Sequence, residues 1–579
     1  MKTVVFRARR TWRELTRGRP PRLSREPGGP EPAGPVLAES RTLLYPSEVA
    51  AEFALQAGKV QNLRAAAAWL DGLRVGAGQT FSFWRHVGRP TRGRGFAAGR
   101  ELREGCIVPS VGGGLCQLSN ALYAAALDAG CEIVERHAHS RRVPGSMAAA
   151  GRDATVFWNY VDLRFRPPVD CRLEVRLTRR ELVVRLRALA ADALPRPLTA
   201  LPAVTAATLP EVESCETCGV ATCFRHRAHA HSAETHRSSG SRRAHGPHTA
   251  WLVDGWWPEF DRYLQDGRQP GDWLFLPLDG RRFRLCAYRW QAVGFARVRQ
   301  APRETLGRSW QSRRLAAQGA TRQRALLAFD EALAARFARG LPPEALHLVV
   351  SQTLLPHLWR AGVLGGRTFD VFMTRLPMAE LQETLDRAAA RWPASPTLAD
   401  FRAPAALVTA ETAALAAARR WITPHSAVAR LAGGRAEKLA WEVPAAARSR
   451  AAAGTDVWFP ASTLGRKGAG ELAAAARELG RRVQLGGPLL EGAGAWQGVD
   501  TIPARTDQAG VGVVVLPAWV EHQPRRLLAA VAAGLPVIAS EACGLDGVPG
   551  VVQVPVGDAD ALKATLARHF CMETAAPVA

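Results

Sequence analysis

The 579-residue sequence contains no uninterrupted apolar run of about 18 residues, which is the length that a membrane-spanning helix needs. Its most apolar stretch, LLAAVAAGLPVIAS, is short and is broken by Gly534 and Pro536. The basic start of the chain, MKTVVFRARRTWRELTRGRPPRLSREPGG, lacks the apolar segment of a secretory signal. We therefore expect a cytoplasmic protein without a membrane span. Thiols stay reduced in that compartment, so the ten cysteines are expected to be free, catalytic or metal-bound.

Acidic residues are also scarce, with 52 Asp and Glu against 76 Lys and Arg, which leaves a net charge of +24. Such a field attracts phosphates, acidic polymers or anionic membrane surfaces. The simpler interpretation is an arginine-rich composition spread over solvated faces. Because the basic residues form no recognisable nucleic-acid motif, no specific nucleic-acid partner is expected.

Periodicity and composition predict a multidomain chain, an α+β domain followed by an α/β unit of two Rossmann-like domains. A helical pattern begins within residues 43–73, where apolar positions such as Val60, Leu63, Ala67 and Leu70 recur at spacings of three and four. Strand-like patterns at 131–139 and 154–165 and a hairpin near 171–189 complete the α+β part. Later, short apolar strands alternate with Ala-rich helices, which favours parallel sheets. The expected segments are a basic disordered arm, the α+β domain, a Cys/His-rich linker and the two Rossmann-like domains, at residues 1–40, 41–200, 205–250, 251–445 and 446–579.

The stretch VPSVGGGLCQLSNALYAAAL places Cys116 where three glycines meet a predicted helix. A cysteine in the first turn of a helix lies near unpaired N–H groups and the positive end of the dipole, which favour a thiolate. In CEIVERHAHS, alternation along a strand places His137 and His139 on one face, and either histidine could act as the base. Asp153 or Asp162 follows and could orient the imidazole. Alternatively, Cys116 is a small packing residue and the histidines bind backbone carbonyls.

Residues 45–190 closely resemble the VanW family, which is named after an accessory protein of glycopeptide-resistance clusters. The resemblance implies a link to the cell envelope and does not name a reaction. The matching positions are Phe81–Phe83, Gly112–Gly114, Cys116, Gln117, Ser119, Leu122, Tyr123, Glu135, Arg136, His137, His139, Ser140, Ala154–Val156 and Asp162.

A cluster of soft ligands follows in CETCGVATCFRH, with Cys215, Cys218, Cys223 and His226 spaced C-x2-C-x4-C-x2-H. Four such ligands can close a tetrahedron around zinc, and three cysteines with one histidine can also hold an iron–sulfur cluster. The alternative is a flexible linker with reactive thiols.

The C-terminal segment resembles the donor-binding domain of two-domain (GT-B) glycosyltransferases that use sugar nucleotides. Its strand, Glu521, helix, Gly534 and second buried strand follow the layout of that family, whose Glu-x7-Glu motif has Ala529 here at the second position. Lys467 occupies the Lys-Gly position, where the resemblance implies that it neutralises the donor diphosphate. His425, after an earlier strand, could touch donor or acceptor, or it could cap a helix.

Three functions follow from these patterns. The first is sugar transfer from a nucleotide sugar to a cell-envelope or polysaccharide precursor, with Lys467 and Glu521 at the donor. The second is a Cys–His thiol enzyme of the amidase, peptidase or transpeptidase kind centred on Cys116. The third is an envelope-associated binding protein without catalysis.

Overall fold

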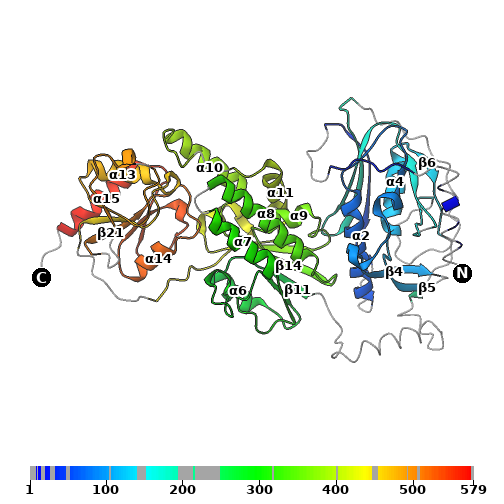
Figure 1. Ribbon diagram of the computed structural model, residues 1–579, viewed down its shortest axis with the longest axis horizontal. Helices are drawn as coiled ribbons and strands as arrows, with labels where there is room; N and C mark the ends of the chain where they lie inside the picture. The colour runs from blue at the N-terminus through cyan, green and yellow to red at the C-terminus, as the bar shows by residue number, and fades with distance from the viewer. Residues whose placement is uncertain are drawn as a thin grey trace.

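The computed structural model describes residues 20–26, 33–46, 52–103, 106–139, 151–158, 160–192, 213–214, 248–315, 319–398, 402–445, 454–491, 493–504 and 509–574, together with single positions between residues 5 and 14. Figure 1 shows three parts in a row, with the N-terminal part (blue to cyan) at one end and the C-terminal part (orange to red) at the other. In the described parts of the chain, no helix has both the length and the apolarity needed to cross a bilayer.

The N-terminal part is built on a four-stranded antiparallel sheet in the order β1-β9-β8-β2. Two helices, α2 and α4, pack on this sheet and share one apolar core with it. The hairpin expected near 171–189 is present as β8 and β9. The bounds are β1 Val36–Leu43, α2 Phe53–Leu70, β2 Leu73–Val75, α4 Cys116–Asp128, β8 Cys171–Leu177 and β9 Glu181–Ala188.

Two three-stranded sheets, β10-β5-β4 and β3-β7-β6, complete this part. Strand β6 is shorter than the predicted strand at 131–139, because the residues after Glu135 bond to the segment around Asp153 instead of to a ladder. The predicted strand at 154–165 is likewise reduced to β7. The bounds are β3 Phe81–Ser82, α3 Phe83–Val87, η2 Arg92–Arg94, β4 Ala98–Arg103, β5 Cys106–Val111, β6 Glu132–Glu135, β7 Arg164–Arg166 and β10 Glu213–Ser214.

The central part is a seven-stranded parallel sheet in the order β13-β12-β11-β14-β15-β16-β17. Chain connections cross from one side of β11 to the other, as in a doubly wound fold. The strands are β11 His248–Leu252, β12 Trp273–Leu276, β13 Arg297–Gln300, β14 Ala345–Ser351, β15 Thr368–Phe372, β16 Trp421–Thr423 and β17 Ala436–Lys438. The helices are α6 Pro258–Gly267, η3 Cys286–Tyr288, α7 Pro302–Arg314, α8 Gly319–Ala338, α9 Leu355–Arg360, α10 Met378–Arg391, α11 Ala405–Ala417, α12 Ser426–Ala432 and η4 Gly433–Arg435.

The C-terminal part repeats this plan with a six-stranded parallel sheet in the order β20-β19-β18-β21-β22-β23. The expected fold class, an α+β part followed by two parallel-sheet α/β units, is therefore confirmed. The strands are β18 Asp456–Phe459, β19 Val483–Leu485, β20 Thr501–Pro503, β21 Val511–Leu516, β22 Val537–Ser540 and β23 Val551–Val554. The helices are η5 Gly465–Lys467, α13 Ala469–Glu478, η6 Ala493–Trp496, α14 Arg525–Ala532, η7 Glu541–Cys543 and α15 Ala559–Thr574.

The carboxyl edges of the two parallel sheets face each other. His425 follows β16, and its Nε2 lies 2.8 Å from the backbone oxygen of Glu521, which follows β21. The next residue, Ser426, donates its backbone N–H to the carbonyl oxygen of Gly544 at 3.2 Å. In open α/β sheets, ligands bind outside the carboxyl ends of the strands, so this junction is where a ligand of both units would lie.

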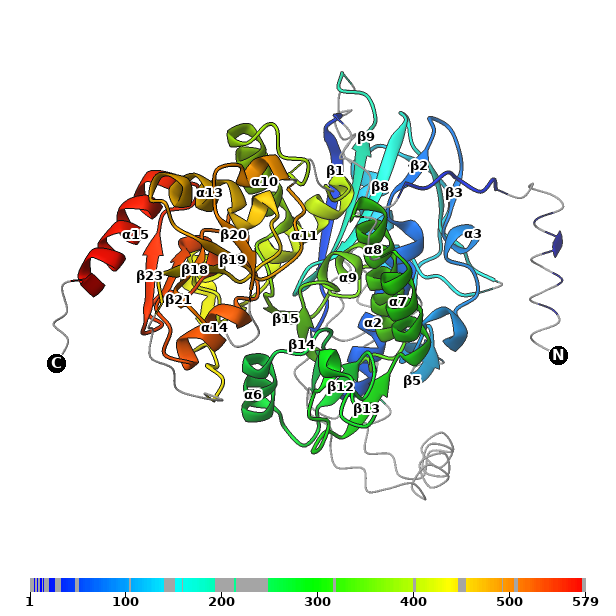
Figure 2. The same cartoon turned by 60° about the vertical axis from the view of Figure 1, so that its left-hand side comes forward.

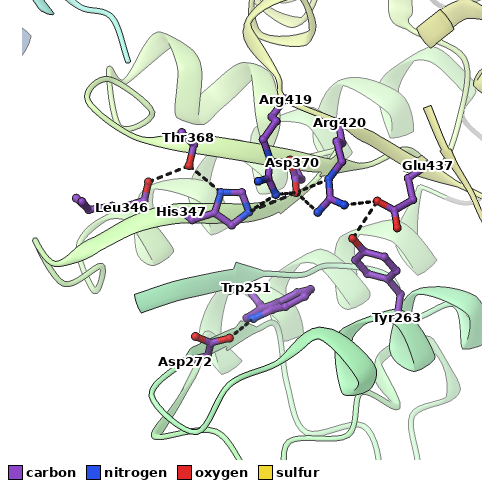
Figure 3. A network of polar contacts seen from close by, with 10 residues as sticks. All are labelled: Trp251, Tyr263, Asp272, Leu346, His347, Thr368, Asp370, Arg419, Arg420 and Glu437. Atoms are coloured by element: carbon purple, nitrogen blue, oxygen red, sulfur yellow. Dashed lines mark hydrogen bonds and ion pairs between the residues drawn. The ribbon is translucent and has the colours of Figure 1, made fainter. Parts of the chain in front are cut away.

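The amino edge of the seven-stranded sheet carries an ion-pair network instead (Figure 3). Asp370 of β15 is fully buried and accepts hydrogen bonds from Arg419 and Arg420, which immediately precede β16. His347 of β14 lies 3.3 Å from the same carboxylate. Burial would raise the pKa of Asp370, but the bonds from Arg419, His347 and Arg420 hold it well below its ordinary range. This network links β14, β15 and β16 on the side away from the facing edges.

The N-terminal part contacts the central part through two glycines that precede β15. The Nε of Arg64, on α2, donates to the carbonyl oxygen of Gly365 at 2.5 Å. The backbone N–H of Gly366 donates to the carbonyl oxygen of Thr178 at 2.8 Å. Burial lowers the pKa of Arg64 to about 10. A Cβ on Gly365 would lie 2.7 Å from Leu177 Cβ, so glycine allows this close approach.

Candidate functional site

Helix α4 begins at Cys116, and Leu115 separates it from the last of the three glycines. Gly112 and Gly114 have φ of 87° and 92°, a region that favours glycine. A Cβ on Gly113 would lie 2.4 Å from the carbonyl oxygen of Gly99, so the backbone of this loop runs directly against β4. The glycines thus fix the point at which α4 starts, and the thiol enters at the positive end of the helix.

The Cys116 thiol is enclosed by the segment that follows Asp153. Its Sγ lies 3.6 Å from Thr155 Oγ1 and 3.8 Å from the backbone oxygen of Val156, and the His139 imidazole is near enough to act on the charge of the thiol. Burial alone would raise the pKa of this thiol. The hydrogen bond and charge of His139, with smaller contributions from Val156 and Thr155, lower it below its ordinary value.

His139 is held from its other side by Asp153. Its Nδ1 lies 2.5 Å from Asp153 Oδ1, and its backbone N–H donates to Asp153 Oδ2 at 2.5 Å. Burial acts to lower the pKa of His139, but the bonds to Asp153 and Cys116 raise it to about 10. Burial also acts to raise the pKa of Asp153, and the two bonds from His139 bring it below its ordinary value. The arrangement supports a thiolate–imidazolium pair oriented by a carboxylate.

Two further residues of α4 anchor the segment that carries Asp153. Ser119 Oγ donates to the carbonyl oxygen of Ala154 at 2.5 Å, and Asn120 Oδ1 accepts from the backbone N–H of Ala154 at 2.7 Å. These two bonds satisfy the carbonyl and the N–H of Ala154, a residue of the predicted strand at 154–165. Sequence reasoning assigned no role to Asn120. Its position one turn after Cys116 on the same helix was the available signal.

The other two predicted members lie elsewhere. The half-exposed His137 side chain places its Nε2 3.5 Å from Glu135 Oε1. Asp162 is buried and accepts from Ser82 Oγ at 2.6 Å and from Arg164 Nε at 2.9 Å. The structure therefore brings Cys116, His139 and Asp153 together, and it places Asp162 in the support of β3 and β7.

The predicted donor-binding pair also meets. Lys467 Nζ lies 2.9 Å from Glu521 Oε2 and donates to the backbone oxygen of Val520 at 3.0 Å. The layout of strand, Glu521 and helix predicts that Glu521 opens the helix, and this is wrong. Helix α14 starts only at Arg525, because Pro524 restricts the residue before it. Gly534 follows α14 with a φ of 79° and turns the chain into β22.

Basic groups gather between the facing edges. His522 has a pKa well below its ordinary value, first because of burial and then because of nearby positive charges. Those charges belong to His425, Lys467, Arg375 and Arg466. His425 itself is buried, and burial likewise lowers its pKa. Because the lowered pKa values leave both histidines neutral, Lys467, Arg375 and Arg466 carry the positive charge here, and such charge attracts an anion such as a diphosphate.

The predicted metal ligands Cys215, Cys218, Cys223 and His226 lie outside the described residues, so zinc or an iron–sulfur cluster there stays a prediction. Within the ranges that the structure describes, no group of three or more His, Cys, Asp or Glu side chains could hold a metal ion.

Cys116 lies in a segment that matches a known protein family. Residues 58–187 match the family described as "VanW like protein". The vancomycin B-type resistance protein VanW of Enterococcus faecalis is 33% identical over 146 residues, which are 25% of this chain and 53% of that protein. The uncharacterized protein YoaR of Bacillus subtilis is 37% identical over 118 residues, 20% of this chain and 38% of that protein. The chain thus spans about half or less of the length of these relatives.

The two parallel-sheet units resemble solved glycosyltransferases of the GT-B kind. Sucrose-phosphate synthase from Thermosynechococcus elongatus has a TM-score of 0.35 and 15% identity, and the match covers 56% of this chain and 90% of that one. The catalytic domain of starch synthase IV from Arabidopsis thaliana, solved with ADP and acarbose, has a TM-score of 0.32 and 11% identity over 56% of this chain and 92% of that one. Likeness at this level transfers no activity.

Proposed function

We propose that the VanW-like domain is a cysteine-dependent acyl-transfer enzyme acting on an amide. The observations that carry the proposal are the bond between His139 and Asp153 and the proximity of His139 to Cys116, which lowers the pKa of the thiol. A thiolate at the start of α4 attacks the amide carbonyl carbon and forms a thioester, while the leaving amine takes the proton of the His139 imidazolium. Water or a second amine then gives its proton back to His139, attacks the thioester and releases the Cys116 thiolate.

An activated ester tests this chemistry without knowledge of the natural substrate. We expect p-nitrophenyl acetate to acetylate Cys116 in the full chain, as seen by intact mass and peptide mapping. Cys116→Ala should abolish that modification, and His139→Ala should slow it by at least about tenfold. The exposed Cys286 provides an internal comparison. Equal acetylation of Cys286 and Cys116 would refute a special role for Cys116.

A second function is supported by a separate observation, the convergence of Lys467, Glu521 and further basic groups between two facing carboxyl edges. We propose that this unit binds a nucleotide sugar and transfers the sugar to a cell-envelope or polysaccharide precursor. Lys467 would neutralise the diphosphate as a point charge, and Glu521 would hold the Lys467 ammonium at the edge. Ala529 stands where the resembling enzymes carry a second glutamate, so the ribose would need another partner.

Calorimetric titration with UDP-, ADP- and GDP-sugars tests this proposal. One of them should bind, and Lys467→Ala should weaken it at least about tenfold. Lys563→Ala, which removes an equally basic residue from an exposed pair with Glu478, is the matched control. If no nucleotide sugar binds at millimolar concentration, the proposal fails.

A further inference from the structure

Helix α7 presents an exposed face that is both apolar and basic. Leu306 and Trp310 are exposed by 60% and 62%, which is unusual for large apolar side chains. Arg303 and Arg313 are also exposed, and the four positions are spaced by three, four and three residues. That spacing places them on one side of a helix. The opposite side buries Thr305, which donates to the carbonyl oxygens of Pro277 and Ala301.

The charge around this face has one sign. Residues 280–314 contain ten arginines and a single acidic residue, Glu304. Arg308 pairs with the buried carboxylates of Asp254 at 2.7 Å and Asp330 at 3.2 Å, and Arg281 lies 3.5 Å from the buried carboxylate of Asp261. All ten arginines except Arg308 are exposed. The guanidinium carbon of Arg314 lies 5.5 Å from the Trp310 ring centroid. An exposed cation therefore lies beside an exposed aromatic ring on this surface.

The adjoining strand extends the same surface. Strand β13 ends one residue before α7 begins, and all four of its residues are exposed. Among the strands that the structure describes, it is an edge strand whose one partner is β12, and Figure 2 shows both strands at one edge of the central part. Arg297 and Arg299 share one face of the strand, where their guanidinium groups lie 5.2 and 5.9 Å from the Trp273 ring centroid, and the exposed Val298 points to the other face. We call α7 and β13 together the α7 surface.

We propose that the α7 surface docks the protein on a membrane that contains anionic phospholipids. Arginines on the polar margin and leucine or tryptophan on the other side are the composition of helices that lie in the interface of a bilayer. Leu306 and Trp310 enter the headgroup boundary, and the long arginine side chains reach the phosphates around them. The inference depends on neither proposed activity.

Other occupants fit these residues less well. A second copy of the chain docking through the same face would bring the same arginines opposite one another, and like charges repel at such an interface. A single-stranded nucleic acid would stack on Trp310, but it would leave aliphatic side chains such as Leu306 and Val298 without a role. A lipid surface uses the charge and both kinds of apolar side chain.

Vesicle co-sedimentation of the full chain tests the proposal. Vesicles of phosphatidylcholine with phosphatidylglycerol should bind the protein at least about tenfold more tightly than pure phosphatidylcholine, and binding should fall as salt rises. The variant Arg303→Glu with Arg313→Glu should lose most of this binding. Arg477→Glu with Arg482→Glu, which changes the same charge on the C-terminal unit, should bind like the wild type. Equal binding to both kinds of vesicle would overturn the proposal.

The apolar half of the surface needs its own variant. Leu306→Ser with Trp310→Ser removes side chains that are already exposed, so thermal unfolding should change little while vesicle binding falls at least about tenfold. Binding that depends on the arginines but is unchanged in this variant would overturn membrane docking in favour of a soluble polyanion. Competition by inorganic polyphosphate at constant ionic strength would then identify that polyanion binding.

Discussion

His139 Nδ1 lies 2.5 Å from Asp153 Oδ1, and the same carboxylate accepts the backbone N–H of His139 through its second oxygen. Because both bonds come from one residue, Asp153 fixes the position of the ring as well as its charge. The pKa of His139 rises to about 10, and that of Cys116 falls below its ordinary value. At a pH above the lowered pKa of Cys116 and below about 10, the pair is a thiolate and an imidazolium.

The first prediction concerns the reactivity of Cys116. In the wild type, the rate of alkylation by iodoacetamide should fall less between pH 9 and pH 6.5 than for a thiol of ordinary pKa, because His139 lowers the pKa of Cys116. In His139→Ala the thiol pKa rises, so the rate at pH 6.5 should fall at least about tenfold and recover toward pH 9. Rates from quantitative peptide mapping check this. Identical pH profiles for the two proteins would contradict the thiolate–imidazolium pair.

The second prediction separates the two aspartates. Asp153→Asn should slow alkylation of Cys116 at pH 6.5, since a neutral amide stabilises the imidazolium less. Asp162→Asn should leave that rate unchanged and cost roughly 2 kcal/mol of stability, because the buried carboxylate accepts from Ser82, Trp84 and Arg164. Alkylation rates and thermal unfolding of both variants are the measurements. The reverse pattern would assign the catalytic role to Asp162.

The third prediction is a pH dependence that originates at Lys59 on α2. Burial and the nearby charge of Arg100 lower its pKa to about 7, although Glu52 acts in the opposite direction. In the unfolded chain the pKa is near 10.4. Between these values the unfolded state binds more protons, so stability rises with pH, by up to about 2.5 kcal/mol from pH 7 to pH 9.

Lys59→Met should remove this rise and stabilise the protein at pH 7. A methionine keeps the unbranched stem that lies against Gly114, where a Cβ would approach Lys59 Cγ to 2.2 Å. Apparent Tm values measured at pH 7 and pH 9 for both proteins provide the comparison. An unchanged pH slope in the variant would show that Lys59 keeps an ordinary pKa.

The fourth prediction concerns the link between the two parallel-sheet units. Arg525 of α14 donates to both carboxylate oxygens of Glu259 on α6 at 2.7 Å, and its guanidinium lies 5.3 Å from the ring centroids of Trp257 and Trp441. Arg525→Ala leaves the buried Glu259 carboxylate without its cation. We expect a loss of roughly 3 kcal/mol, seen as a lower Tm and faster proteolysis between the units.

Arg525→Lys should restore little of this loss, because an ammonium replaces neither the two parallel bonds nor the stacking. If Arg525→Lys behaves like the wild type, the link depends on charge alone.

Strand periodicity predicted the parallel sheets well because β14, β21 and β22 are buried on both faces and read as continuous apolar runs. It was wrong for residues 136–139 and 154–158, where backbone groups bond to Asp153, Ser119 and Asn120 in place of a neighbouring strand. Side-chain hydrogen bonds of this kind connect residues 14 to 35 positions apart, so they produce no periodic pattern in the sequence.

The candidate thiol site was predictable in part for the same reason. The position of Cys116 at a helix start follows from Gly112–Gly114, which is local information. The choice of His139 over His137 and of Asp153 over Asp162 depends on how the chain turns after β6, which alternation along an assumed strand cannot give. Glu521 shows the same limit, since Pro524 rather than the acidic residue decides where α14 begins.

The bond from Arg64 to Gly365 has a practical consequence for dividing the chain. A fragment ending near residue 200 would expose the Arg64 guanidinium on α2 and would remove the Gly365 carbonyl that accepts from it. The same truncation would also remove the hydrogen bond from the backbone N–H of Gly366 to the carbonyl oxygen of Thr178. To express the N-terminal part alone, the surface that contacts the central part should therefore be redesigned, for example with a polar substitution at Leu177. A simple truncation would leave that surface exposed.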